Sequence, residues 1–257
     1  MAASRTTARA GKKARIGLIG MGAIGSFLAS HLRERVAWVC DLDEGAAKKR
    51  LRELKLKARF VKKPEPGVGL VVECASQAAV QLLAGTLKYA DAMILSVGAL
   101  TDEGLRRKLE ATARRHGHRI YIPSGAIGGL DALKSCGPHD VLLETRKPPA
   151  SLGRSDSKPT VVFEGSARAA CKALPKSVNV SATLAIAGIG FEKTRVRVIS
   201  DPAVKKNMHT VRIKGETGAY AFVFENNPLK ENPRTSALAA RSALRLIEEL
   251  DAPLQLR

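Results

Sequence analysis

Apolar residues in the first half of the chain alternate between short continuous runs and stretches where they recur every three or four positions. The runs predict buried strands at 15–19, 36–40, 69–74, 92–97 and 119–122. The three- and four-residue spacing predicts helices at 24–32, 78–87 and 103–116. Strands that alternate with helices in this way are typical of a parallel, doubly wound sheet.

The pattern changes after Gly128 and Gly129. Lys147-Pro148-Pro149 and the polar stretch 151–159 indicate a loop. A small-residue helix is predicted at 178–187, and strands at 194–200, 209–214 and 219–225, the last two joined as an antiparallel hairpin. Asn232-Pro233-Arg234-Thr235-Ser236 precedes a final helix with one apolar face, formed by Ala239, Ala243, Leu246, Ile247 and Leu250.

The two patterns predict an α/β protein with an N-terminal Rossmann-type, doubly wound parallel sheet and a second α/β domain containing a mixed or antiparallel sheet. We expect a basic disordered tail at 1–13 and a dinucleotide-binding domain at 14–126. A substrate and oligomerisation domain follows at 127–234, and residues 235–257 form a C-terminal helix that can pack back on the first domain.

A glycine-rich loop joins the first predicted strand to the first helix. Gly20 suits a tight turn, Gly22 lets the backbone approach a pyrophosphate, and Gly25 lets helix and strand pack closely. An ordinary glycine turn is the alternative for this motif taken alone. The candidate cofactor-binding residues of this loop are Gly20, Met21, Gly22, Ala23, Ile24 and Gly25.

Asp41 follows the second predicted strand, 16 residues after Gly25, where an acid can accept hydrogen bonds from the adenosine ribose hydroxyls. Its charge disfavours a ribose 2'-phosphate and so favours NAD over NADP. Three nearby cations, Lys48, Lys49 and Arg50, weaken that preference. NADP therefore stays open as a cofactor.

Small residues follow the next three predicted strands. In doubly wound sheets, ligands bind beyond the carboxyl ends of the strands. The candidate cofactor loops are 74–77, 96–99 and 123–126. Ala75, Ser76 and Ala126 are the residues singled out in them. The alternative interpretation of each loop is an ordinary turn that requires small side chains and binds no cofactor.

Composition limits the partners and the compartment. The 257 residues are 45% hydrophobic, which argues against disorder, and the excess of 43 Lys+Arg over 24 Asp+Glu gives a net charge of +19. Nucleic acid is nevertheless disfavoured, because only six Phe, three Tyr and one Trp could stack on bases. Four widely spaced cysteines predict reduced thiols of a cytoplasmic protein and no metal site. No apolar run is long enough to span a membrane.

His209 is the histidine with the most informative position. It begins a predicted strand and lies on the same side as Val211 and Ile213, at the inner edge of a sheet. A hydrogen-bonded core histidine is one interpretation. Proton transfer during a dehydrogenase reaction is the other, because histidine titrates closest to neutrality.

Several segments in a fixed order carry a resemblance to a known family. They are 20–25, 71–77, 95–100, 123–129, 175–180, Asp201-Pro202, Asn207-Met208-His209 and 232–236. Through them the residues after about Ala14 resemble the L-aspartate dehydrogenase family over nearly the whole chain. The resemblance implies catalysis by His209, cofactor contacts at Ala126 and Asn179, and a C-terminal domain that builds the substrate site and an oligomer interface.

The implied reaction is oxidation of L-aspartate by hydride transfer to NAD(P), giving iminoaspartate. Hydrolysis then gives oxaloacetate and ammonia, or the imine feeds pyridine nucleotide biosynthesis. Asp201 and Pro202 either orient His209 or turn the chain. The candidates for binding the substrate and its two carboxylates are Asn207, Lys147, Arg234, Thr235 and Ser236.

Two other functions stay open from the sequence. One is a related amino-acid or imine dehydrogenase with another substrate, which a substrate panel would reveal. The other is a catalytically silent NAD-sensing or nucleic-acid-binding protein, which would bind DNA or RNA in a salt-sensitive way without turning over any amino acid.

Overall fold

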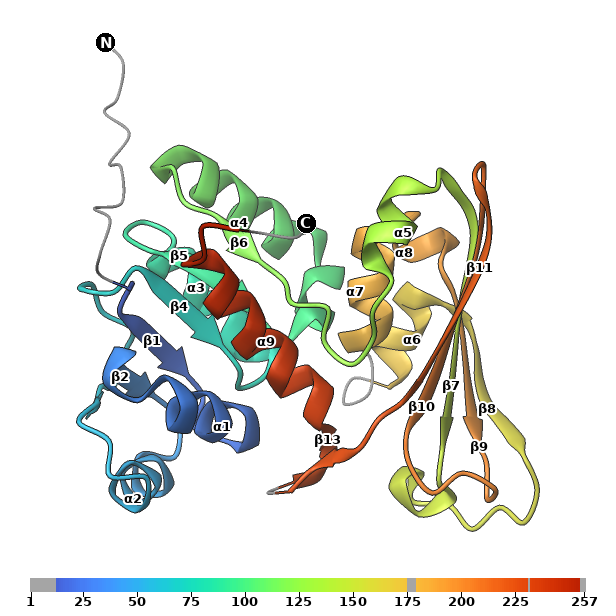
Figure 1. The fold of residues 1–257 in the computed structure, drawn as a ribbon, viewed down its shortest axis with the longest axis horizontal. Coiled ribbons are helices and arrows are strands. Elements are labelled where there is room, and N and C mark those ends of the chain that lie inside the picture. Colours follow the sequence, from blue (N-terminus) through green and yellow to red (C-terminus); the bar gives the residue numbers. More distant parts are fainter. Residues whose placement is uncertain (1–12, 175–178, 231, 255–257) are drawn as a thin grey trace.

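The first half of the chain forms a six-stranded parallel sheet. The computed structural model describes residues 13–174, 179–230 and 232–254, and Figure 1 shows their arrangement. The strand order is β3-β2-β1-β4-β5-β6, with the order reversing beside β1. This order confirms the doubly wound sheet. The strands are β1 (Ile16–Ile19), β2 (Val36–Cys40), β3 (Arg59–Phe60), β4 (Leu70–Glu73), β5 (Asp91–Ile94) and β6 (Ile120–Tyr121).

Helices connect these strands. The helical stretch expected at 78–87 is present, as a 3₁₀ helix followed by one α-helical turn. Its buried residues Val80, Leu83 and Thr86 recur every three positions and face the sheet side of the core. The elements are α1 (Ala23–Leu32), η1 (Arg33–Arg35), α2 (Glu44–Glu53), η2 (Gln77–Leu82), α3 (Leu83–Thr86), η3 (Val97–Thr101) and α4 (Glu103–His116).

The second half contains a five-stranded mixed sheet of order β11-β10-β7-β9-β8. Strands β7 and β9 are parallel, and β10 and β11 form the predicted antiparallel hairpin. The mixed sheet confirms the expected second α/β unit. Its strands are β7 (Pro138–Lys147), β8 (Thr160–Ser166), β9 (Arg195–Ser200), β10 (Met208–Gly215) and β11 (Gly218–Glu225).

Strand β7, which contains His139, was not predicted from the sequence. In the middle of the strand every second residue is buried, namely Val141, Leu143 and Thr145. The alternation is therefore present, but charged residues on the other face and the flanking prolines obscure it.

Helices α5 to α8 lie between the two sheets, as Figure 1 shows. The final helix, α9, packs on α1, and its Ala243 and Ile247 are buried in the same cluster as Leu28. The remaining elements are α5 (Leu130–Ser135), η4 (Pro149–Leu152), α6 (Ala167–Ala173), α7 (Asn179–Ala187), α8 (Gly190–Lys193), β12 (Pro228–Leu229), β13 (Asn232–Ser236) and α9 (Ala237–Leu250).

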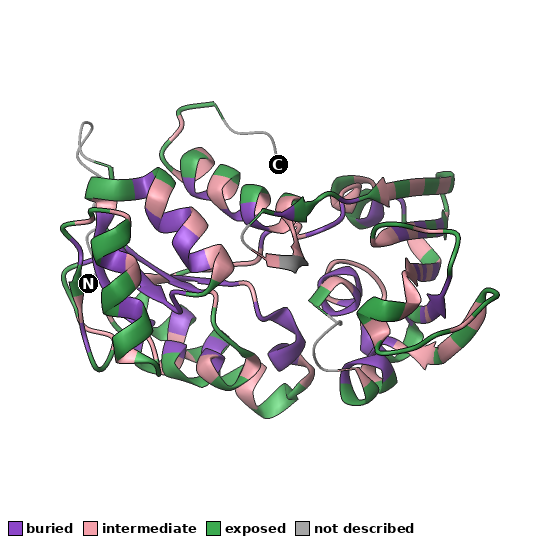
Figure 2. Cartoon of the chain, turned by 90° about the horizontal axis from the view of Figure 1, so that it is seen from below, coloured by how far each residue is buried: buried purple, intermediate pink, exposed green. Residues whose placement is uncertain are grey.

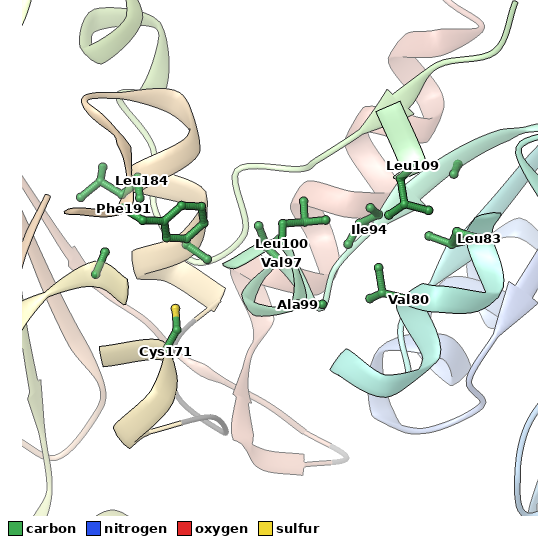
Figure 3. Close-up of a cluster of buried hydrophobic side chains, with 14 of the residues drawn as sticks. Val80, Leu83, Ile94, Val97, Ala99, Leu100, Leu109, Cys171, Leu184 and Phe191 are labelled. Carbon is green, nitrogen blue, oxygen red and sulfur yellow. The ribbon is translucent and has the colours of Figure 1, made fainter. Parts of the chain in front are cut away.

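One apolar cluster continues from the first sheet into the helices of the second half. Val97 and Leu100 of η3 lie between Ile94 on one side and the helix residues Leu184 and Phe191 on the other (Figure 3). Burial is therefore continuous across the junction and not confined to each half (Figure 2). This packing fixes the two sheets relative to each other, and with them the space between.

None of the helices in the described ranges is both long enough and apolar enough to cross a bilayer.

Candidate active site

The glycine-rich loop leaves room in front of α1. Gly20 has a φ of +103°, and a Cβ atom at Gly25 would lie 2.0 Å from the Gly20 carbonyl oxygen. At Gly22, in contrast, a Cβ atom would meet nothing within 4 Å, and no side chain caps the helix at this residue. The open space at an uncapped helix N-terminus suits an anionic ligand such as a pyrophosphate.

Asp41 is held directly against this loop. Its Oδ2 accepts a hydrogen bond from the Met21 N–H at 2.6 Å, and its Oδ1 accepts one from the Asp43 N–H at 3.0 Å. Lone pairs remain on both oxygens for ribose hydroxyls.

The three cations near Asp41 lie on α2 and form ion pairs there. Lys48 pairs with Glu44 at 2.6 Å, while Lys49 and Arg50 pair with Glu53. These exposed pairs partly compensate the charges that would otherwise attract a 2'-phosphate.

A cavity lies beyond the carboxyl ends of β5 and β6, where small and apolar residues from both halves of the chain meet. We call it the interdomain cavity because residues of both halves line it. Asn179, the first residue of α7, accepts a hydrogen bond from the Gly98 N–H through its Oδ1 at 3.1 Å. The amide nitrogen of Asn179 is thus the atom left to meet a ligand. The lining residues are Ile24, Leu95, Val97, Pro123, Gly125, Ala126, Asn179, Val180, Thr183 and Ala239.

Ala75 and Ser76 lie beside the glycine loop rather than in the wall of the interdomain cavity. A Cβ atom at Gly20 would come within 2.8 Å of Ala75, so the two loops touch. The N–H groups of Ala75 and Ser76 donate to Oε1 of Glu73 at 2.9 and 3.0 Å. Both residues are exposed.

A second, polar cavity lies next to η4 and β13. Three of the predicted substrate residues, Asn207, Thr235 and Ser236, are part of its wall. Lys147 is not, and the side chain of Arg234 lies outside the described residues. The lining residues are Pro148, Ser151, Lys205, Lys206, Asn207, Asn226, Pro228, Thr235 and Ser236.

Asn226 connects the two cavities. It lines the polar cavity, and its Nδ2 donates a hydrogen bond at 2.9 Å to the carbonyl of Ala126, which lines the interdomain cavity. Its backbone N–H donates to the carbonyl of Asn207 at 3.1 Å. The walls of the two cavities are therefore joined at Asn226 and Ala126.

His209 lies two residues after Asn207 on β10. It is buried on the same face as Val211 and Ile213, as predicted. Its Nδ1 is 2.9 Å from Oγ1 of Thr145, the residue opposite it on β7. Burial, with a smaller contribution from the charge of Lys147, lowers the pKa of His209 to about 4. The imidazole is therefore neutral at neutral pH.

Lys147 ends β7, two residues after Thr145, and is largely covered. Burial lowers its pKa from the ordinary lysine value. The positive charge of Lys147 also contributes to the lowered pKa of His209.

Asp201 turns the chain and does not contact the ring of His209. Its Oδ1 accepts a hydrogen bond from the Ala203 N–H at 2.9 Å, and its Oδ2 accepts one from Arg146 at 2.7 Å. The hydrogen bond from Arg146 holds the pKa of Asp201 below its usual value. Of the two interpretations that the sequence left open, the geometry favours the turn.

Four residues of this region were not singled out as site residues from the sequence. Thr145 carried no signal, because β7 itself was not recognised. Asn226 lies just beyond β11, where polar residues ordinarily end a hairpin. Lys205 and Lys206 carry no signal in the sequence beyond their charge, yet they line the polar cavity.

Two family models match consecutive parts of the chain. "Homoserine dehydrogenase, NAD binding domain" matches residues 20–123, and "Aspartate dehydrogenase, C-terminal" matches residues 129–250. An L-aspartate dehydrogenase of Methanosarcina acetivorans is 41% identical over 267 aligned residues, covering 94% of this chain and 98% of that protein. One of Thermotoga maritima is 42% identical over 194 aligned residues, covering 73% and 79%.

Solved structures agree with these matches. The crystal structure of aspartate dehydrogenase from Thermotoga maritima superposes with a TM-score of 0.80 at 32% identity, covering 96% of this chain and all of that one. An amine dehydrogenase of Mycobacterium smegmatis has a TM-score of 0.59 at 12% identity, covering 94% and 93%. This second likeness concerns the fold alone.

Proposed function

The chain belongs to the L-aspartate dehydrogenase family, and on that premise we propose that His209 takes up the proton released when the substrate is oxidised. The activity is NAD(P)-dependent oxidation of the CH–NH₂ group of L-aspartate. The family and the activity expected from the sequence are thus confirmed. A silent NAD-sensing or nucleic-acid-binding protein and a dehydrogenase for another substrate are not favoured.

The cofactor site that we propose runs from the glycine loop to the interdomain cavity. The space at Gly22 and the uncapped N-terminus of α1 fit a pyrophosphate, and Asp41 fits the adenosine ribose. Ala126 and the amide nitrogen of Asn179 would hold the nicotinamide end. When bound, the cofactor supplies the hydride acceptor.

We assign the substrate to the polar cavity, because Asn226 joins it to the interdomain cavity. Thr235, Ser236, Asn207 and the cations Lys205 and Lys206 offer donors for two carboxylates. Lys147, buried near His209, adds a third positive charge to the neighbourhood. Arg234 stays a candidate from the sequence.

His209 then acts through Nε2, because its Nδ1 faces Thr145. The neutral imidazole accepts a proton from the substrate ammonium as hydride leaves Cα, and iminoaspartate forms. The two substrate carboxylates oppose the charge of Lys147, so they raise the proton affinity of His209 in the complex. Water then hydrolyses the imine to oxaloacetate and ammonia, unless another reaction, such as pyridine nucleotide biosynthesis, consumes it.

The observation that carries this assignment is a buried, neutral histidine hydrogen-bonded through Nδ1. The test is an initial-rate assay at 340 nm with L-aspartate and NAD. His209→Ala is expected to lose about 10³-fold or more in kcat, while its Kd for NADH stays within about twofold of the wild type. Unchanged turnover in this variant would rule out His209 as the proton acceptor.

We further propose that the chain divides near Ile127 into a cofactor domain and a substrate domain, with α9 returning to the first. The two family models support this division, because the first match ends at residue 123 and the second begins at residue 129. Limited proteolysis, expected to cut between them, tests it.

A homo-oligomer in the cytoplasm that does not use nucleic acid is the proposed working state. The four cysteines are free thiols, many cations are engaged in ion pairs within the chain, and Val223 on the edge strand β11 is 63% exposed. Light scattering of the purified protein tests the oligomer, and a DNA titration tests the absence of nucleic-acid binding.

A further inference from the structure

Glu73 is a fully buried carboxylate at the carboxyl end of β4. It takes no part in the ion pairs of the described residues, and instead accepts four hydrogen bonds from uncharged donors. Its Oε1 accepts from the N–H groups of Ala75 and Ser76 at 2.9 and 3.0 Å and from the Ser96 hydroxyl at 2.9 Å. Its Oε2 accepts from the Ser96 N–H at 3.0 Å.

These hydrogen bonds tie together the two loops that follow β4 and β5. Ala75, in the first loop, touches Gly20 of the glycine loop. Ser96, in the second loop, stands between Leu95 and Val97, and both of these line the interdomain cavity. The Glu73 side chain is therefore hydrogen-bonded to two loops, one beside each end of the proposed cofactor site.

The connection continues into the second half of the chain. Ser96 immediately precedes η3, whose Gly98 N–H donates to Oδ1 of Asn179 at 3.1 Å. Val97 and Leu100 of the same helix pack against α7 and α8 (Figure 3). The position of Ser96 therefore influences where Asn179 meets the interdomain cavity.

We propose that Glu73 is a positioning residue for the nicotinamide cofactor: its carboxylate sets the loops at 74–76 and 96–98 in the arrangement that accepts the dinucleotide. This inference rests on the proposed cofactor site. In this proposal Glu73 acts through the two loops and not by direct contact with the reacting atoms.

A carboxylate suits this task better than an amide. All four partners are donors, so each oxygen must accept, and an amide NH₂ would face an N–H or O–H group. Burial raises the pKa of Glu73 above its ordinary value, and the hydrogen bonds from Ser96 and from the N–H groups of Ala75 and Ser76 oppose this rise without cancelling it. Removing this buried acceptor would leave several donors without a hydrogen-bond partner, which is unfavourable for the loops that carry them.

Glu73→Gln tests the proposal, with Thr86→Ala as the matched control. Thr86 is also a buried polar residue of the first half, but its hydroxyl bonds only within α3, to Leu83, outside the cofactor loops. NADH affinity is measured by titration, using energy transfer from Trp38, the single tryptophan. Thermal unfolding is followed for each variant.

We expect the Kd of Glu73→Gln for NADH to rise about tenfold or more, as for loss of hydrogen bonds to a charged group. The KM for L-aspartate at saturating NAD should stay within about twofold, because the polar cavity is not part of the two loops. Thr86→Ala, at comparable destabilisation, should bind NADH like the wild type. Ser96→Ala, which removes one of the four donors, should weaken NADH binding about threefold.

A folded Glu73→Gln protein whose NADH affinity stays within twofold of the wild type would overturn the proposal. If that variant does not fold, an unchanged affinity in Ser96→Ala overturns it instead. Equal weakening in Thr86→Ala would also do so, since general destabilisation would then explain the loss. A wild-type chain that binds no NADH contradicts the proposed cofactor site itself, which distinguishes the two failures.

Discussion

The Oγ1 atom of Thr145 lies 2.9 Å from Nδ1 of His209, across the buried pair of strands β7 and β10. This contact fixes the ring on one side and leaves Nε2 for chemistry. It also makes a residue from an unpredicted strand part of the candidate catalytic site.

Replacing Thr145 by valine should lower kcat about tenfold, because the ring loses a hydrogen bond of roughly 1 kcal/mol and with it a defined orientation. The KM for NAD should not change. Thr145→Ser keeps the hydroxyl and serves as the control, with kcat expected near the wild-type value. Steady-state kinetics with L-aspartate test this prediction. Equal kcat values for Thr145→Val and the wild type would contradict a role of Thr145 in orienting His209.

Folding stability should fall as the pH drops from about 6.5 toward 4. In the folded chain the pKa of His209 is lowered to about 4, whereas the unfolded histidine titrates near 6.5, so only the unfolded state binds the proton in this window. The stability lost between pH 7 and pH 5 through this residue is about 2 kcal/mol.

Urea unfolding at the two pH values checks this expectation. His209→Asn should show a pH dependence smaller by about 2 kcal/mol, because its side chain does not titrate. The other titrating groups are common to both proteins and cancel in the comparison. The same pH dependence in both would contradict the lowered pKa.

Substrate affinity should depend on the lysines of the polar cavity. Lys205→Met is expected to raise the KM for L-aspartate about fivefold with little change in kcat, because an interaction with a ground-state carboxylate is also present in the transition state. Lys49→Met, on α2, removes the same charge elsewhere and should leave the KM unchanged. If both variants behave alike, Lys205 does not bind the substrate.

Asp41 should determine the preference for NAD. Asp41→Ser is expected to shift the ratio of kcat/KM between NAD and NADP about tenfold or more toward NADP, since it removes acceptors for the ribose hydroxyls and a charge that repels a 2'-phosphate. Asp43→Ser removes an equal charge two residues away, where the side chain caps α2. A similar shift in both variants would point to net charge and not to ribose binding.

The two glycines of the loop should respond differently to alanine. Gly22→Ala adds a methyl group to open space, so the melting temperature should not change, while NADH binding weakens about tenfold if the pyrophosphate needs that space. Gly25→Ala forces a Cβ atom to within 2.0 Å of the Gly20 carbonyl oxygen and should destabilise the fold by 1 kcal/mol or more, as an order of magnitude. Thermal unfolding and NADH titration separate the effects.

Much of the fold could be predicted because local sequence carries its signals. The run at 15–19, the glycines that follow and the apolar spacing of the next helix are local features, and they predicted β1, the loop and α1. The helix at 103–116 was predicted from its apolar spacing with the bounds that the structure has. There the Asp102 side chain caps its beginning, and Gly117, with a φ of +72°, ends it. Strand β7 was missed because burial of one face depends on β10 and β9, which are distant in the sequence.

By itself the sequence determined the doubly wound sheet, the glycine loop with Asp41, and the burial of His209 beside Val211 and Ile213, since each follows from spacing along one or two elements. Only the tertiary structure decided that Thr145 meets His209, that Asn226 joins the two cavities, and that Glu73 accepts its four hydrogen bonds. These contacts join residues up to 100 positions apart. Their geometry depends on sheet order and on the packing between the two halves, which no local pattern encodes.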